Sequence, residues 1–264
     1  MIPSSTPYAY ERSIDPLTVI AARITSRDRW LLTLLYEHRV LTSEHLTALV
    51  FPNIIRTRQR LLHLYRMGVV DRFRPLSKAG SLPFHYTLGP IGAELLAAER
   101  DLDPKQLLRN RNRTVALAAS PQLAHIVGVN GFFATLATIH RIHPEARLTD
   151  WWSERQCIRK WGERIRPDGY GVLTVAGEDK PFFLEYDRGT ETLGRVAAKL
   201  DAYRKFQFGT VLFWFPSTAR ERNFLRECQS SSIPFAVANV SRGVATDDVW
   251  MLRDGVPKSI VEIL

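Results

Sequence analysis

Apolar positions recur every three or four residues in the first part of the chain, which is the spacing of amphipathic helices. Alternating or continuous apolar runs bounded by Gly and Pro indicate strands between them. The expected elements are helices from Ser26, over 43–50, 54–67 and 91–100, and strands over 69–74 and 83–88. Three helices followed by strand, loop and strand are the order of a winged helix-turn-helix, which we assign to residues 26–100. Residues 1–25 are then an N-terminal extension.

The third of these helices carries a basic face opposite its leucines. Arg56, Gln59, Arg60 and His63 fall on neighbouring turns, as a helix that enters the major groove requires. Basic residues around the wing suit phosphate or minor-groove contacts. The candidate DNA-binding residues are Arg56, Arg58, Gln59, Arg60, His63, Arg72, Arg74 and Lys78. The alternative is a solvated basic helix in a winged helix that serves dimerisation or protein contact.

Residues 101–120 are polar and rich in arginine, and we interpret them as an exposed linker. The pattern after this linker alternates helices and strands over residues 121–264. The expected elements are helices over 121–142, 192–206 and 217–229, and strands over 156–160, 171–176, 181–186, 210–215 and 235–240. The continuous apolar run over 210–215 is typical of a buried central strand. We therefore expect an α/β sandwich around a mixed sheet, within a chain of the α+β class overall.

Charge narrows the set of partners. The 264 residues include 36 Lys and Arg against 27 Asp and Glu, a formal net charge of +9. This excess favours a polyanionic partner, and double-stranded DNA is the first candidate. Cys157 and Cys228 lack the spacing of a zinc site or a disulfide framework. No stretch approaches the length of a membrane span and no signal peptide is evident, so we expect a cytoplasmic protein.

Acidic residues stand at the ends of a predicted hairpin. Asp168 precedes the strand over 171–176, Glu185 lies near the end of the strand over 181–186, and Asp187 directly follows that strand. We expect these three carboxylates to converge at one sheet edge. Hard oxygen ligands gathered in this way suit Mg²⁺ or Mn²⁺, which can activate water at a phosphodiester. The alternative is an ordinary Pro-Asp-Gly turn with solvated edge acids.

The hairpin resembles the core of PD-(D/E)xK nucleases, with Pro167-Asp168 as the first half of the motif and Glu185-Tyr186-Asp187 in place of E-x-K. Together with the preceding winged helix, residues 25 to 240 resemble the replication-relaxation family of plasmids and integrative elements. That family is similar to C-class mobilisation relaxases. The resemblance implies a restriction-endonuclease-like fold, Asp168 and Glu185 as metal ligands, and Asp187 as a third acid. It also implies that Lys199 replaces the lysine that Asp187 displaces. Glu154 is a weaker ligand candidate, and His125 a minor one for any site role.

These features lead to a DNA-processing hypothesis: the winged helix selects a site, and the second domain nicks a strand there, with catalytic residues Asp168, Glu185, Asp187 and Lys199. Tyr186 and Tyr203 are alternative covalent nucleophiles, although core packing explains each tyrosine more simply. The rival hypothesis is a transcription or replication regulator whose nuclease-like domain is only a scaffold. A protein-interaction adaptor is a third. A homodimer and a mobilisation or replication complex are open alternatives for the assembly.

Overall fold

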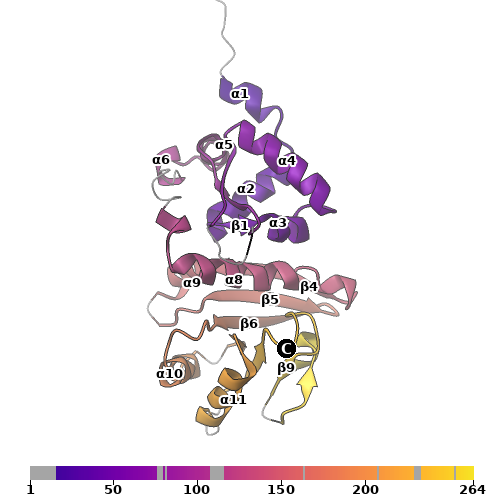
Figure 1. The fold of residues 1–264 in the computed structure, drawn as a ribbon, viewed down its shortest axis with the longest axis vertical. Helices are drawn as coiled ribbons and strands as arrows, with labels where there is room; N and C mark the ends of the chain where they lie inside the picture. The colour runs from indigo at the N-terminus through magenta and orange to yellow at the C-terminus, as the bar shows by residue number, and fades with distance from the viewer. Residues whose placement is uncertain are drawn as a thin grey trace, which may run out of the picture.

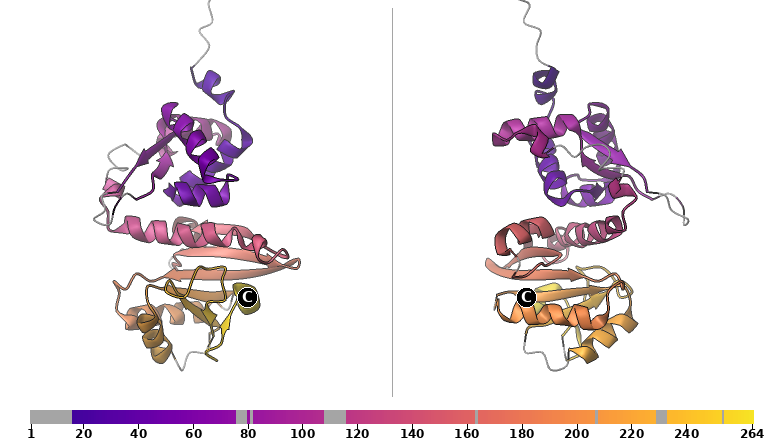
Figure 2. Two further views of the ribbon diagram at one scale, coloured as in Figure 1. Left: turned by 45° about the vertical axis from the view of Figure 1, so that its right-hand side comes forward. Right: turned by 90° about the vertical axis from the view of Figure 1, so that its left-hand side faces the viewer.

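The computed structural model describes residues 16–75, 80, 82–107, 116–162, 164–206, 208–228, 233–252 and 254–264. Its elements form two parts that follow the order of the chain (Figure 1). We call residues 16–107 the N-terminal half and residues 116–264 the C-terminal half. Helix α8 (Gln122–Leu136) lies between the helices of the N-terminal half and the large sheet of the C-terminal half, as all three views show (Figures 1 and 2).

The N-terminal half combines helices with a small antiparallel sheet of order β1-β3-β2. Its elements are α1 (Pro16–Ala21), α2 (Ser26–His38), β1 (Leu41–Thr42), α3 (Ser43–Leu49), α4 (Ile54–Arg66), β2 (Val70–Phe73), β3 (His85–Leu88), α5 (Pro90–Arg100) and α6 (Pro104–Leu107). Caps define the helix starts: Thr25 and Thr42 each form a capping box, and Asn53 caps α4. The cap of α2 is therefore Thr25 and not Ser26. Buried leucines of α2, α3 and α4 form the core.

The C-terminal half is built on a mixed sheet of seven strands in the order β10-β9-β8-β7-β6-β5-β4. Its remaining elements are η1 (Ile139–Arg141), β4 (Ala146–Ser153), α9 (Glu154–Trp161), β5 (Gly169–Val175), β6 (Glu178–Tyr186), α10 (Leu193–Arg204), β7 (Thr210–Phe215), α11 (Thr218–Glu227), β8 (Phe235–Asn239), β9 (Trp250–Met251), β10 (Pro257–Lys258) and α12 (Ile260–Ile263). Strands β6, β7 and β8 are parallel, and β4, β5 and β6 are joined antiparallel. The predicted hairpin, mixed sheet and central strand β7 are confirmed.

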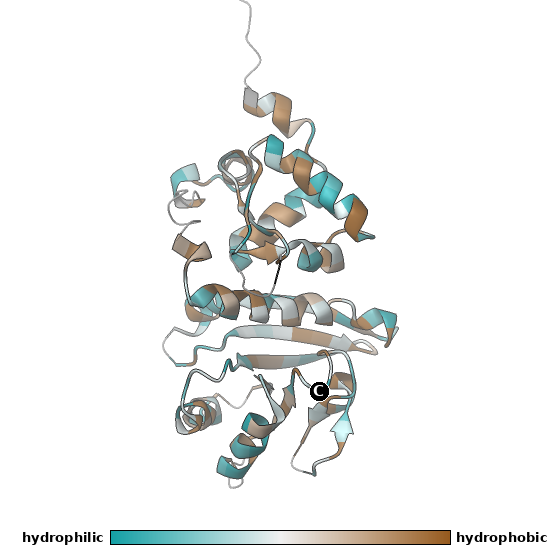
Figure 3. Cartoon of the chain, viewed as in Figure 1, coloured by the Kyte–Doolittle hydropathy of each residue, from teal (hydrophilic) through white to brown (hydrophobic). Residues whose placement is uncertain are grey.

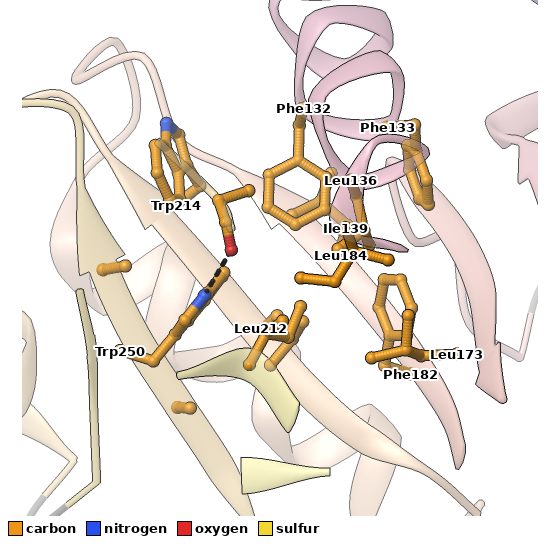
Figure 4. Close-up of a cluster of buried hydrophobic side chains, with 14 of the residues drawn as sticks. Phe132, Phe133, Leu136, Ile139, Leu173, Phe182, Leu184, Leu212, Trp214 and Trp250 are labelled. Carbon is orange, nitrogen blue, oxygen red and sulfur yellow. Dashed lines mark hydrogen bonds between the residues drawn. The ribbon is translucent and has the colours of Figure 1, made fainter. Parts of the chain in front are cut away.

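Alternate residues of the central strands serve two cores, one on each face of the sheet. Phe182 and Leu184 pack beneath α8, where Figure 4 shows them with Phe133 and Trp250. Trp250 donates its indole N–H to the carbonyl oxygen of Ala245 at 3.0 Å. The opposite face packs against α9, α10 and α11. Hydrophobic residues mark the central strands, whereas several turns of α4 and α11 are hydrophilic (Figure 3).

One predicted strand is wrong. Residues 156–160 belong to helix α9, because Ser153 and Gln156 form a capping box that starts a helix at Glu154. Strand β4, which precedes this cap, was not predicted, and it forms the edge of the sheet beside β5. The short strands β1, β9 and β10 were also missed, because two residues carry too little pattern for any period.

The segment Gln122–Arg141 is long and apolar enough to cross a membrane by length and composition alone. This corrects the expectation that no stretch approaches that length. The packing accounts for the apolar composition of the segment, because α8 contacts β6 of the sheet as well as α3 and β1 of the N-terminal half. A core helix that is covered on two sides is apolar nearly all round.

Candidate functional site

A cleft of about 400 Å³ opens where strand β6 ends, beside α8, α9 and α10. Its lining includes Asp168, Glu185, His125, Glu154, Lys199 and Arg39. The side chains that line the cleft therefore come from the hairpin and its ends, from the surrounding helices and from the N-terminal half. Figure 1 shows α8 and α10 on opposite sides of the sheet that carries the hairpin.

Asp168 is held at the start of the hairpin by contacts to the opposite strand. Its backbone N–H donates to the Leu184 carbonyl at 3.0 Å, and its Oδ2 accepts the backbone N–H of Tyr186 at 2.7 Å. Its Oδ1 lies 3.0 Å from Nε2 of His125. Burial lowers the pKa of His125, but the hydrogen bond to Asp168 and the charge of Asp168 outweigh burial and raise it. This pairing favours an imidazolium that donates to the carboxylate.

Glu185 is a buried carboxylate of the cleft, with 2% of its surface exposed. Its Oε2 accepts from Lys199 Nζ at 2.7 Å, and its Oε1 accepts from the Tyr203 hydroxyl at 2.5 Å. Burial, joined by the negative charge of Asp168, raises the pKa of Glu185 to about 7, although Lys199 and Tyr203 oppose this shift. Burial lowers the pKa of Lys199, but the charges of Glu185 and Asp168 raise it above its ordinary value.

Asp187 has a different partner. Its carboxylate forms an ion pair with Arg220 of α11, whose Nη2 lies 3.0 Å from Oδ1, and the same Oδ1 accepts the backbone N–H of Gly189. Arg220 also donates to the Glu191 carbonyl at 2.5 Å. Within the described residues, no group of three or more His, Cys, Asp or Glu side chains is arranged to hold a metal ion. Asp168, Glu185 and Asp187 all line the cleft, as expected, but the carboxylate of Asp187 is engaged by Arg220.

The two tyrosines considered as nucleophiles are both engaged by neighbours. Tyr203 is 5% exposed, and burial, with the charge of Glu185, raises its pKa well above the ordinary value. Tyr186 packs its ring edge-on against His125, with the centroids 5.9 Å apart. A neutral, buried phenol is a poor nucleophile, so the geometry favours packing and positioning for Tyr203. Glu154 is exposed at the start of α9 and lines the same cleft.

The candidate DNA-binding residues of the N-terminal half divide into exposed and paired groups. Arg56, Arg58, Gln59 and His63 are exposed on α4. Arg60 is not free in the same way, because its Nε and Nη2 donate to the carboxylate of Asp28 at 3.0 and 2.5 Å. Its Nη2 also donates to the Arg23 carbonyl at 3.0 Å. Arg60 therefore connects α4 to α2.

The two arginines at the end of β2 stack on aromatic rings. The guanidinium of Arg72 lies 4.4 Å from the ring centroid of Tyr65 and 4.3 Å from that of Phe84. Arg74 lies 4.1 Å from the Phe84 centroid. Stacking of this kind orients a guanidinium while leaving its edge available to an anion. Lys78 lies outside the described residues.

Sequence reasoning missed Arg39, which lines the cleft, and Arg220, which engages Asp187 of the cleft. Arg220 follows Asp187 by 33 positions, and Arg39 stands in a loop of the N-terminal half. Neither position carries a local signal, because both act through tertiary contacts. Asp168, Glu185 and Lys199, in contrast, lie together in the cleft from elements that the sequence indicated.

The fold and the cleft define a mixed α/β protein with a carboxylate- and lysine-lined cleft behind a helical N-terminal half. A family model described as replication-relaxation matches residues 32–212, most of the chain and both halves. The chain belongs to the replication-relaxation family, which associates it with the replication of plasmids or other mobile elements. No curated protein and no solved structure shows a significant match to the chain.

Proposed function

We propose that this protein binds double-stranded DNA of a plasmid or mobile element and cleaves one strand in the cleft of its C-terminal half. The observation that carries the proposal is the placement of Asp168 and Glu185 in one cleft with Lys199 bonded to Glu185. Lys199 supplies from α10 the cation that the E-x-K sequence would supply from β6. Two acids and a lysine at the end of a hairpin are the polar groups that a PD-(D/E)xK nuclease uses.

The N-terminal half supports the DNA-binding part of the proposal. Its helices α2, α3 and α4 precede the strands β2 and β3, as in a winged helix-turn-helix. Arg56, Gln59 and His63 are exposed on α4, the helix that would enter the major groove. We assign DNA recognition to residues 26–100 and strand processing to residues 121–264.

The carboxylate oxygens of the cleft are donors of the kind that a hard divalent cation prefers. Asp168 and Glu185 would hold Mg²⁺ or Mn²⁺, with Glu154 as a further oxygen donor on the same cleft. When bound, such an ion activates water and neutralises charge on a phosphodiester. Lys199 contributes positive potential beside Glu185, and His125 orients Asp168 through its ring nitrogen. Asp187 is left to position α11 through Arg220.

One observation favours a second candidate function, a non-catalytic regulator of replication or transcription. Each carboxylate oxygen of Asp168 and Glu185 already has a protein group at hydrogen-bonding distance, from His125, Tyr186, Lys199 or Tyr203. The network is satisfied without a cation, as a structural scaffold would be. In that case the cleft would stabilise the fold, and DNA binding would be the whole activity.

The two candidates differ in their response to metal. We would compare the wild type with Asp168→Asn, Glu185→Gln and the control Asp201→Asn, which changes an exposed acid of α10 outside the cleft. The nuclease proposal expects the wild type and the control to melt higher in Mn²⁺ and to nick supercoiled plasmid, because a bound ion stabilises the folded state. The two cleft variants should lose both effects and keep duplex affinity. If the wild type binds duplex DNA but neither nicks the plasmid nor melts higher in Mn²⁺, the result would establish the regulator.

A further inference from the structure

The loop between α2 and β1 has a strained backbone at a non-glycine residue. Arg39 has φ 70° and ψ −49°, and the backbone N–H of Val40 donates to the His38 carbonyl at 2.8 Å. These values and the bond from residue i+2 to residue i define a γ-turn with positive φ, which is rare and strained. Strain at such a position persists only where the surroundings hold the turn, and it gathers at functional sites.

Helix α8 holds this turn from the other half of the protein. Asn130 is 3% exposed, and its Nδ2 donates to the carbonyl oxygens of His38 at 3.0 Å and of Val40 at 2.6 Å. On the other side, the His38 ring stacks on Trp151 of β4 with centroids 3.5 Å apart. The same helix α8 carries His125 into the cleft. Asn130 and Trp151 therefore fix the turn relative to Asp168 and its neighbours.

The turn directs a cation toward the cleft. Arg39 lines the cleft together with Asp168, His125 and Glu154. Among the described residues, it is the one residue of the N-terminal half that lines the cleft. Its Nε is buried and has no hydrogen-bond partner. A buried N–H of a charged group without an acceptor is costly. Arg39 is unpaired in the described part of the chain, where no ion pair includes it.

The other cations of the cleft are already engaged. Lys199 donates to Glu185, and Arg188 donates to the Pro121 carbonyl at 2.8 Å. Burial lowers the pKa of Arg39, the charge of Arg155 lowers it further, and Glu154 opposes both. An arginine side chain nevertheless stays protonated in proteins, so Arg39 presents a full positive charge. It faces a cleft in which Asp168 and Glu185 have protein partners of their own.

We propose that Arg39 binds a phosphodiester group of a DNA strand in the cleft and thereby makes the cleft a joint site of the two halves. The planar guanidinium matches two phosphate oxygens, and its terminal nitrogens would donate to them. This inference rests on the proposed function, because it requires that the cleft admit a DNA strand. The γ-turn is the device that aims Arg39, and Asn130 is its positioning residue.

The test uses the full chain and a fluorescein-labelled single-stranded oligonucleotide in buffer with EDTA, over a range of salt concentrations. The variants are Arg39→Gln, Arg39→Gly and the matched control Arg222→Gln, which removes an exposed arginine of α11 outside the cleft. Glycine adopts positive φ without strain, so Arg39→Gly removes the side chain while it relaxes the turn. Its melting temperature should equal or exceed that of the wild type.

We expect both Arg39 variants to bind the oligonucleotide about tenfold more weakly, as the loss of a hydrogen bond to a charged group implies. The slope of log affinity against log salt should become shallower by about 0.7, the value of one phosphate contact on a single strand. Arg222→Gln should match the wild type in both measurements. Equal affinity and equal slope for Arg39→Gly and Arg222→Gln would overturn the proposal.

Two further arms separate the causes of failure. In the first arm, inorganic phosphate is added to the wild type and to Arg39→Gly. If phosphate raises the melting temperature of the wild type only, while both proteins bind the oligonucleotide equally well, DNA is refuted as the ligand. If the wild type fails to nick plasmid in Mn²⁺ while oligonucleotide affinity depends on Arg39, cleavage is withdrawn and the phosphate contact stands. If nicking persists and Arg39→Gly binds as the wild type does, the phosphate contact is withdrawn and cleavage stands.

Discussion

Charged side chains are concentrated both on the outer face of α4 and in the cleft at the end of β6. They are mostly exposed and unpaired on α4, but buried and paired in the cleft. On α4, Arg56 is exposed and no described residue forms an ion pair with it, and Arg58 approaches Glu44 only to 4.0 Å. In the cleft, Glu185 is bonded to Lys199 and Tyr203, and Asp187 is paired with Arg220. Water solvates the first group, whereas burial forces the second group to find partners.

Because their charges differ in exposure, the two regions would bind a ligand in different ways. An exposed arginine can reach a phosphate by displacing only water and counterions. A buried carboxylate must exchange a protein partner for its ligand, so a metal ion in the cleft would compete with Lys199 and His125. Arg39 combines the two cases, because it is half-buried yet has no hydrogen-bond partner for its Nε.

The largest expected effect contrasts a buried pair with an exposed arginine. Arg220→Ala leaves Asp187, whose side chain is 5% exposed, without its ion-pair partner. We expect the free energy of unfolding to fall by about 3 kcal/mol. Arg58→Ala, on the exposed face of α4, should change it by no more than about 0.5 kcal/mol. Urea denaturation of both variants measures the contrast, and equal losses would erase the distinction between the two regions.

The second effect concerns the junction between the halves, where the ring of His38 is buried and no described residue pairs with it by charge. Burial lowers the pKa of His38 to about 3, so the folded state keeps the ring neutral, while the unfolded chain takes up a proton near the ordinary value of 6.5. The contribution of His38 to stability should therefore be full above pH 6.5 and fall by about 1.4 kcal/mol per pH unit as the pH drops toward 3.

Denaturation midpoints between pH 7 and 5 test this prediction. His38→Phe keeps a flat ring for stacking on Trp151 and removes the titration, so its stability should depend less steeply on pH. A residual slope is expected from His45, whose pKa burial lowers to about 4. Parallel pH profiles for His38→Phe and the wild type would show that His38 is not the group that titrates.

The smallest effect separates two arginines on the same helix. Arg56→Ala should weaken duplex affinity by about 1 kcal/mol or somewhat more, as the loss of a base contact does, and leave stability unchanged. Arg60→Ala should chiefly lower stability, because Asp28 is 1% exposed and depends on Arg60 for two hydrogen bonds. Fluorescence anisotropy and urea denaturation of both variants give the comparison. If Arg60→Ala lost more DNA affinity than Arg56→Ala, Arg60 would have to be counted among the DNA-binding residues.

Much of the secondary structure was open to prediction because it depends on short-range periodicity. The strand over 210–215 and the hairpin with Asp168 before it and Glu185 near its end follow from apolar runs and a Gly-containing turn. The basic face of α4 also follows from helical spacing. Residues 156–160 show the limit of this reasoning, because the capping box at Ser153 decided for helix where the apolar pattern alone suggested a strand.

The sequence by itself determined which residue types stand near the cleft: the acids at the ends of one hairpin and a lysine on the helix that follows. Only the tertiary structure decided which charges are paired, because Arg220 meets Asp187 and Arg60 meets Asp28 across 33 and 32 positions. The tertiary structure also decided the conformation of the turn at Arg39, because Asn130, about 90 positions away, holds that turn. Local pattern sets the period of each element, whereas the partners of buried polar groups depend on how distant elements pack.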